Sequence, residues 1–315
     1  MSKKNNTDKI DTIQFDFESD DIKQKTAKSD KKVNKKNSKK SGKGKGLIYN
    51  ICIVIFFLIF AGCAIYLIKY FYETKKSEDR FDDLKTLIDT DVVDDEGQKE
   101  IVYIGTDTGS DKKEEFVSID GKLVLKKLAN LYSKNNDFMG WITIPGADID
   151  YPVMQTIEDE EYYIYRDFDK EYSSSGTLFI DSCSDVGRPS DVILIYGHNM
   201  KAGTMFHNLT KYDDEEFYKE HKLIQFDTIY GSGTYEIIAA FKDKIYPEDY
   251  TGIKYYDFFD ASSEEEFDAY ISYCKSKTPY NTDTSAEYGD KLICLSTCAY
   301  HTTDGRFAVI AKKIK

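Results

Sequence analysis

The chain has 315 residues, a formal net charge of −13 and 41% hydrophobic residues. This length allows one or two domains with a sizeable core, which excludes a small scaffold that depends on disulfide bonds. The 25 tyrosines and 19 phenylalanines favour β-strands.

An uncharged run from Leu47 to Ile68 contains 22 residues. As a helix it would be ~33 Å long, which is enough to span the hydrocarbon core of a membrane. Residues 1–46 carry 14 lysines against seven acidic residues. The excess of lysine predicts a cytoplasmic N-terminus and an extracellular C-terminal domain. A cleaved signal peptide is the alternative, but the run is too long and no A-x-A-like site follows it before Lys69. We therefore expect a single-pass protein of the cell membrane.

Residues 1–46 form a lysine-rich tail that is too polar to build a core, so a disordered cytoplasmic segment is expected. The tail can also lie on the anionic lipid of the inner leaflet, as polybasic segments next to a membrane span do. Nucleic acid is not expected as a partner, because the membrane topology already accounts for the lysines.

The next segment, residues 69–121, is acidic and is predicted to be a stalk between the anchor and an extracellular domain over 122–315. Two sets of apolar residues, one in the stalk and one at the start of the domain, have helical spacing. The first set predicts a short helix in the stalk, and the second predicts a packed helix at the start of the domain. They are Phe81, Leu84, Leu87 and Ile88, and Leu123, Leu125, Leu128, Leu131 and Tyr132.

Short β-rich segments separated by turn residues dominate the chain from Trp141 onward. Eight such strands fit a closed barrel, so the predicted fold class is mainly β. The predicted strands are 141–144, 149–154, 176–181, 191–197, 222–230, 233–242, 290–297 and 306–313. Two helical insertions interrupt them, at about 205–220 and at 262–277, where Phe267, Tyr270, Ile271 and Cys274 share one face.

Three candidate catalytic side chains stand at predicted strand ends. Cys298 ends one apolar strand, His198 ends another, and Arg306 begins the strand that follows Cys298. A thiol, an imidazole and a guanidinium are the parts of a thiol acyl-transfer site, in which the thiolate attacks a carbonyl and the cation stabilises the oxyanion. Arg306 is one of only four arginines, beside 39 lysines, so a guanidinium fork has a specific use where it occurs.

These residues lie in motifs that resemble the two signature regions of sortases, which are membrane-anchored cysteine transpeptidases of Gram-positive cell surfaces. The first motif is Leu295-Ser-Thr-Cys298 with Arg306. The second is Ile195-Tyr-Gly-His198-Asn-Met-Lys201, followed by Gly203-Thr-Met-Phe206. Further segments resemble class B of the family, and the resemblance covers about residues 122–315. Those segments are Asn136-Asp-Phe-Met-Gly-Trp-Ile142, Asp150-Tyr-Pro-Val-Met-Gln155 and Gly176-Thr-Leu-Phe-Ile-Asp181.

The resemblance implies a sortase-type eight-stranded barrel and a transpeptidation without cofactor or metal. Cys298 attacks a threonine carbonyl in the C-terminal sorting signal of a surface protein, His198 moves the protons, and Arg306 orients the signal and stabilises the oxyanion. Ser296, with Thr297, is the predicted substrate-binding pair, because Ser296 resembles a substrate-contacting position of class B. The acceptor is an amine of a peptidoglycan precursor or a pilin lysine. Some class B members have an acidic residue directly after the cysteine, whereas this chain has Ala299.

Other assignments of the same residue types remain as alternatives. His207, His221 and His301 are candidate histidines in polar surroundings, and Arg166 and Arg188 are alternatives to Arg306. Cys294, Cys298 and His301 have loose zinc-ligand spacing but lack a C-x2-C pair and an evident fourth ligand. Cys183, Cys274 and Cys294 could include a disulfide in an extracellular domain.

Two other functions are open at this point. One is a membrane-tethered cysteine peptidase that hydrolyses its acyl-enzyme, and the other is an anchored adhesin or receptor in which Cys298 is structural.

Overall fold

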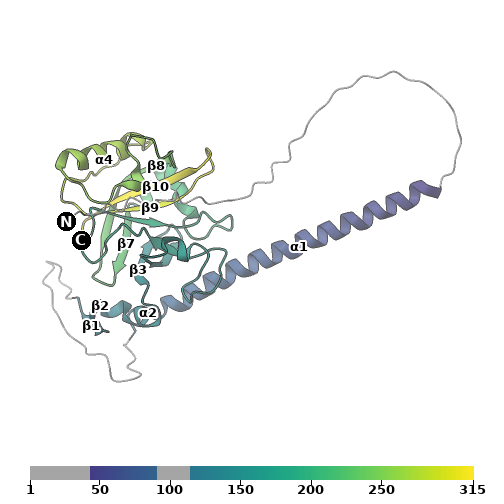
Figure 1. The fold of residues 1–315 in the computed structure, drawn as a ribbon, viewed down its shortest axis with the longest axis horizontal. Coiled ribbons are helices and arrows are strands. Elements are labelled where there is room, and N and C mark those ends of the chain that lie inside the picture. Colours follow the sequence, from purple (N-terminus) through teal and green to yellow (C-terminus); the bar gives the residue numbers. More distant parts are fainter. Residues whose placement is uncertain (1–42, 91–113) are drawn as a thin grey trace, which may run out of the picture. The chain divides into compact units, whose positions relative to one another are not determined.

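The computed structural model describes residues 43–90 and 114–315. Most of the lysine-rich tail and residues 91–113 of the predicted acidic stalk lie outside the described residues. The chain divides into two compact units, Met1–Tyr72 and Glu73–Lys315, and the ribbon is drawn in Figure 1.

Helix α1 extends over Lys43–Lys85 and includes the predicted membrane span. From Tyr49 onward this helix is, by length and composition, suited to cross a membrane, and it is the only such helix in the described part of the chain. Apolar side chains on all of its sides, such as Phe56, Phe60 and Ile68, are exposed. A helix that is apolar all round needs a nonpolar environment, so α1 agrees with an anchor.

The last turns of α1 belong to the second unit and pack against its other segments. Phe81 and Leu84 are buried there, and the Phe81 ring lies 5.4 Å from the Tyr151 ring, edge to face. Arg80 Nε donates to Asp169 at 2.5 Å. The compact unit therefore begins at Glu73, well before residue 122, where the sequence placed the start of the domain.

The helix predicted over residues 123–132 is shorter than expected, which corrects that prediction. Strand β1 (Phe116–Ile119) pairs antiparallel with β2 (Lys122–Leu125), followed by η1 (Lys126–Leu128) and α2 (Ala129–Lys134). Asp120 and Gly121 both have positive φ, 51° and 76°, as a two-residue type I′ hairpin requires. The Asp-Gly turn outweighs the helical spacing of Leu123 and Leu125.

Eight strands close a barrel in the order β10-β8-β7-β3-β4-β5-β6-β9, which confirms the predicted fold class. Two neighbouring pairs are parallel, β4 with β5 and β6 with β9, and the others are antiparallel. The strands are β3 Phe138–Ile144, β4 Ile149–Met154, β5 Leu178–Ile180, β6 Val192–Tyr196, β7 Leu223–Thr228, β8 Thr234–Lys244, β9 Leu292–Cys298 and β10 Gly305–Lys313.

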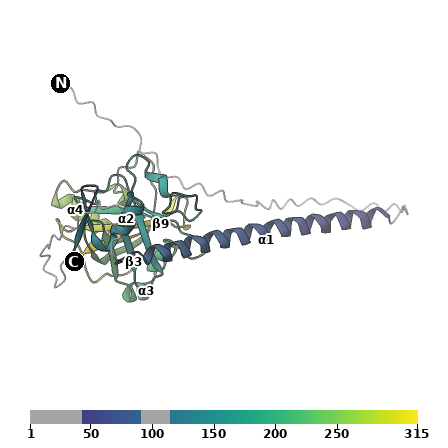
Figure 2. The ribbon, with the colours of Figure 1, turned by 90° about the horizontal axis from the view of Figure 1, so that it is seen from below.

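Strands β6 and β9 are buried at every residue, because the barrel interior covers one face and other segments cover the other. Such strands are apolar without alternation, which explains the continuous runs Val192–Tyr196 and Leu292–Leu295. Helix α4 (Glu264–Lys277) packs along β8 at one side of the barrel (Figure 1 and Figure 2).

Both predicted helical insertions are present. The first consists of η3 (His207–Asp213) and α3 (Glu215–Glu220), and Asp214 caps α3 by accepting from two backbone N–H groups. The second is α4, capped by Ser263 and buried on its predicted face. Two further short helices are η2 (Glu160–Tyr163) and η4 (Tyr255–Asp257).

Candidate active site

The parallel pairing of β6 with β9 brings His198 level with Cys298. Tyr196 is the register partner of Ser296. The chain reaches His198 two residues after the end of β6, and β9 reaches Cys298 two residues after Ser296. The backbone stays paired beyond the strand end, because Gly197 N–H donates to Ser296 O at 3.2 Å. Two residues that are far apart in the sequence therefore share one end of the barrel.

The antiparallel pairing of β9 with β10 sets Arg306 directly opposite Cys298. Directly opposite residues point to the same face of a sheet, with Cβ atoms ~5 Å apart. The structure thus brings together the three side chains that the sequence predicted to be catalytic, through two strand registers.

Cys298 is 7% exposed, and burial raises the pKa of its thiol. The positive charge of Arg306 acts in the opposite direction and lowers this pKa, while Asp304 raises it. Burial in a site of low polarity disfavours the thiolate, and the guanidinium offsets part of that cost. The resting site therefore holds a neutral thiol at neutral pH.

His198 is held by the segment before β5. Its Nε2 lies 2.8 Å from Ile164 O, and because a carbonyl only accepts, Nε2 carries a proton. The Tyr165 ring lies 5.5 Å from the imidazole, centre to centre. Burial lowers the pKa of His198, and the bond to Ile164 opposes this shift. The imidazole is therefore neutral in the resting site as well.

Gly176 leaves room for the backbone carbonyl of Ile164, which packs directly against it. Its φ is +58°, and a Cβ at this position would lie 2.3 Å from Ile164 O. Any side chain would displace the carbonyl that orients His198, so glycine is required at this turn.

Arg306 is 5% exposed, and its Nη1 donates to Gly305 O at 3.1 Å. On the other neighbouring strand its register partner is Asp243, a buried carboxylate that pairs with Lys277 at 2.9 Å. The Arg306 charge also lowers the pKa of the buried Tyr255, against a larger increase from burial. Its electrostatic effect thus reaches both Cys298 and Tyr255.

Ser296 and Thr297 are both buried. Ser296 Oγ and Tyr255 Oη lie 2.8 Å apart, and Thr297 Oγ1 donates to Gly197 O at 2.7 Å. The Thr297 bond ties β9 to the residue before His198 and so helps to position the imidazole. Substrate binding by this pair remains a prediction.

Asn199 has a structural role that the sequence reasoning did not assign. Its Nδ2 donates to Cys298 O at 2.8 Å, and its Oδ1 lies 2.7 Å from His207 Nδ1. Because Oδ1 only accepts, His207 Nδ1 carries the proton. The signal was present in the sequence, since Asn199 directly follows the candidate histidine in a loop at a strand end.

The other histidines and arginines have different surroundings. His221 stacks on Phe217 at 4.2 Å, and Arg166 donates to Tyr162 O at 2.9 Å. The Arg188 side chain is 95% exposed beside Asp185. Cys183, Cys274 and Cys294 are free cysteines, as is Cys298. In the described part of the chain no group of three or more His, Cys, Asp or Glu side chains is arranged to hold a metal ion.

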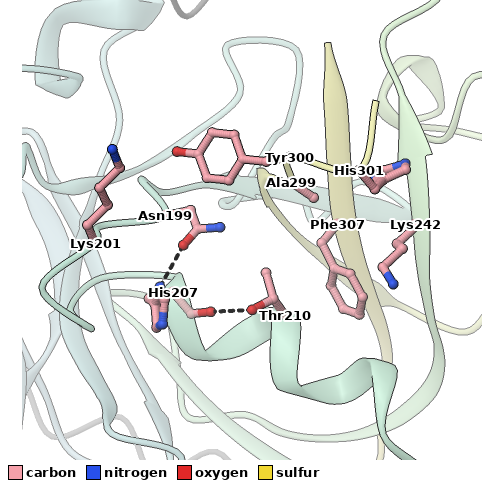
Figure 3. A pocket seen from close by; sticks show the side chains of 9 residues that line it. All are labelled: Asn199, Lys201, His207, Thr210, Lys242, Ala299, Tyr300, His301 and Phe307. Atoms are coloured by element: carbon pink, nitrogen blue, oxygen red, sulfur yellow. Dashed lines mark hydrogen bonds between the residues drawn. The ribbon is translucent and has the colours of Figure 1, made fainter. Parts of the chain in front are cut away.

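A pocket with a cavity volume of about 470 Å³ lies beside this site (Figure 3). Three of its lining residues directly follow the candidate catalytic residues: Asn199, Ala299 and Phe307. The others are Lys201, His207, Thr210, Lys242, Tyr300 and His301.

Comparison with known proteins agrees with this geometry. A sortase domain model matches residues 142–314. Sortase B of Staphylococcus aureus is 30% identical over 194 residues, which cover 61% of this chain and 76% of that protein. Sortase B of Listeria monocytogenes is 30% identical over 175 residues, which cover 56% and 68% of the two chains.

Solved structures of class B sortases are also similar. A complex of Bacillus anthracis sortase B with AAEK1 has a TM-score of 0.60 at 26% identity, covering 78% of this chain and 99% of that one. A substrate complex of S. aureus sortase B has a TM-score of 0.55 at 30% identity, covering 61% and 86%. The chain belongs to the sortase family. Within that family it is a class B sortase, a cysteine transpeptidase.

Proposed function

We propose that Cys298, His198 and Arg306 are the catalytic residues of this transpeptidase, and that it cleaves a C-terminal sorting signal at a threonine carbonyl. The observation that carries the proposal is the double register, which sets Arg306 opposite Cys298 and brings His198 to the same level. A buried thiol, imidazole and guanidinium at one end of a barrel suit acyl transfer better than a purely structural role.

In the first half-reaction the Cys298 thiolate attacks the threonine carbonyl carbon. The C–N bond of the scissile peptide breaks, His198 as imidazolium gives its proton to the departing amine, and a thioester remains on Cys298. The carbonyl oxygen is negative in the tetrahedral intermediate, and the Arg306 fork supplies donors and positive charge at that point. The buried setting strengthens this interaction relative to water.

In the second half-reaction an amine attacks the thioester. The C–S bond breaks as a C–N bond forms, and His198 accepts the proton that the amine loses. We infer an acceptor from a cell-wall precursor or a pilin lysine. The S. aureus sortase B solved with a substrate and a sortase B solved with triglycine support a peptide donor and an amine acceptor of this kind.

The protonation state limits the rate in this proposal. The raised pKa of Cys298 and the lowered pKa of His198 both oppose the thiolate–imidazolium pair that the reaction needs. Only a small fraction of the enzyme is in that state at any pH, and the fraction is largest between the two pKa values. The Arg306 charge raises it by lowering the pKa of the thiol.

We further infer that residues 1–46 are cytoplasmic, that Leu47–Ile68 anchors the chain in membrane lipid, and that the catalytic unit is extracellular. The apolar helix α1 and the lysine-rich flank support this arrangement. Residues 69–121 connect the two as a stalk, of which the part from Glu73 to Lys85 packs on the catalytic unit. We also propose that Ser296 and Thr297 contact the substrate. A substrate that binds Ser296 would have to replace the hydrogen bond between Ser296 and Tyr255.

Product analysis tests the function. The unit Glu73–Lys315 is incubated with a panel of sorting peptides, with and without candidate amines, and products and enzyme are weighed by mass spectrometry. We expect a thioester on Cys298 and an amide product that depends on the amine. Cys298→Ala should abolish both, while Cys294→Ala, at a fully buried position, should retain most turnover.

Two results would contradict the proposal. Hydrolysis without any amine-dependent product would indicate a tethered peptidase. Full turnover by Cys298→Ala would remove Cys298 as the nucleophile and leave the structural role expected in an adhesin.

A further inference from the structure

The side chains of Cys298, Arg306 and Asp243 lie in a row at one end of the barrel. Strand β10 pairs with β9 on one side and with β8 on the other, and Arg306 is directly opposite both Cys298 and Asp243. Directly opposite residues point to the same face of a sheet, with Cβ atoms ~5 Å apart. Arg306 therefore stands between a thiol and a carboxylate, and a guanidinium that moves toward one of them moves away from the other.

A tyrosine from another segment agrees with this arrangement. Burial raises the pKa of the Tyr255 hydroxyl, the positive charge of Arg306 lowers it, and the negative charge of Asp243 raises it further. Phe241, two residues before Asp243 and so on the same face of β8, meets the Tyr255 ring edge to face at 5.7 Å. Arg306 and Asp243 thus face the same buried layer.

Four donors hold the carboxylate of Asp243, and Lys277 is the charged side chain among them. Lys277, the last residue of α4, pairs with Oδ1 at 2.9 Å. Tyr273, one turn earlier on α4, donates to Oδ2 at 2.5 Å, and burial raises its pKa. The other two donors to Oδ1 are Tyr246 Oη at 2.8 Å and the Lys244 N–H at 2.9 Å.

Lys277 is charged in this position. Burial lowers its pKa, but the hydrogen bonds to Asp243 and Tyr246 outweigh that effect, so the pKa is raised. The Asp243 side chain is only 1% exposed, so water cannot replace the ammonium. A buried carboxylate that loses its charged partner is strongly unfavourable and attracts another cation. The cation directly opposite it is Arg306.

We propose that Lys277 is a positioning residue of the active site, which neutralises Asp243 and so keeps the Arg306 guanidinium directed to Cys298 and the substrate. This inference rests on the proposed role of Arg306. Without the charge of Lys277, Arg306 turns to Asp243 and leaves the thiol on the other side of β10. The thiolate then loses the charge that stabilises it, and the oxyanion loses its donors.

The other titratable groups near the thiol are the same in every variant of the test. Burial raises the pKa of Cys298, Arg306 lowers it, and Asp304 raises it. His198 is neutral because burial lowers its pKa, and Tyr255 is neutral because burial raises its pKa well above the ordinary value. A difference between variants therefore reports on the position of Arg306.

Removing the two charges singly and together tests the proposal. Lys277→Gln, Asp243→Asn and the double variant are made in the full chain, held in detergent micelles. Two quantities are measured: kcat/KM for peptide transfer, and the pH dependence of Cys298 alkylation by iodoacetamide. Alkylation is followed by mass spectrometry of the peptide that contains Cys298, because the chain has six cysteines.

We expect Lys277→Gln to lower kcat/KM by about 10-fold to 100-fold, approaching the loss of one oxyanion donor. Its alkylation profile should move to higher pH by on the order of one unit. The double variant should return both quantities to near the wild type, because the charge that draws Arg306 away is gone. Asp243→Asn should transfer like the wild type, and its alkylation profile should not move to higher pH.

Lys312→Gln is the matched control. Lys312 lies near the other end of β10, has a side chain of similar exposure to that of Lys277 (22% against 27%), and pairs with Asp290 at 3.3 Å. Its replacement should change neither quantity. Thermal unfolding checks the fold of each variant. If Lys277→Gln does not fold, Asp243→Asn and the double variant decide, because the proposal requires both of them to transfer.

Three results would overturn the proposal. They are wild-type transfer and alkylation in Lys277→Gln, a double variant as impaired as Lys277→Gln, and a loss of transfer in Asp243→Asn, which would show that the carboxylate itself holds Arg306. Absence of a thioester on wild-type Cys298 would instead contradict the proposed function. The alkylation profile requires no transfer, so the two failures are distinguishable.

Discussion

Replacing Arg306 separates its charge from its geometry. Arg306 is directly opposite Cys298, with Cβ atoms ~5 Å apart, and its charge lowers the pKa of the thiol. Arg306→Lys keeps the charge but loses the planar fork of donors. Loss of one oxyanion donor typically costs on the order of 100-fold or more in turnover, which corresponds to about 3 kcal/mol.

We therefore expect Arg306→Lys to lower kcat/KM for peptide transfer by about 100-fold while the pH dependence of Cys298 alkylation by iodoacetamide stays near that of the wild type. Arg306→Met removes the charge as well, so its alkylation profile should move to higher pH. Both assays are run on the unit Glu73–Lys315. Circular dichroism and thermal unfolding check the fold, because Arg306 is buried.

Arg188→Lys is the matched control, because the Arg188 side chain is 95% exposed and lies beside Asp185. It should have wild-type turnover. Arg166→Lys should also remain near wild type, although Arg166 lies in the segment that holds His198. Near-normal transfer by Arg306→Lys would refute the oxyanion role, and an unchanged alkylation profile in Arg306→Met would refute the electrostatic one.

Burial and packing lead to three further predictions. Because burial raises the pKa of Cys298 above its ordinary value of 9.0, alkylation of this thiol in the free enzyme should increase with pH to a midpoint above 9; a plateau already reached at pH 7 would contradict this. Phe81→Ala should lower the free energy of unfolding by about 3 kcal/mol, measured by denaturant titration, whereas Ile157→Ala, at a residue 66% exposed, should change it by less than about 0.5 kcal/mol. Gly197→Ala places a Cβ 2.3 Å from Leu178 Cδ2, so it should cost about 1–3 kcal/mol of stability and reduce transfer by displacing His198; wild-type stability and turnover would show that the site has room.

The local features of the chain could be predicted from the residues alone. The membrane-length run from Leu47, the eight strands and the α4 insertion depend on hydrophobic period, turn residues and caps, all of which act over a few residues. The Asp120-Gly121 turn is also a local signal, but the helical spacing of the apolar residues after it led to the prediction of a helix. Cys298, His198 and Arg306 could be predicted as candidate catalytic residues, because each stands at or next to a strand end inside a recognisable motif.

The tertiary structure decided what depends on partners far apart in the chain. No local pattern specifies that β6 pairs parallel with β9, yet that register brings His198 level with Cys298. The same holds for the hydrogen bond that His198 donates to the Ile164 carbonyl, for Asn199 between Cys298 and His207, and for the burial of Phe81 on the barrel unit. A period along the sequence shows which face of an element is buried, but the partner that covers the face is set only when the whole chain packs.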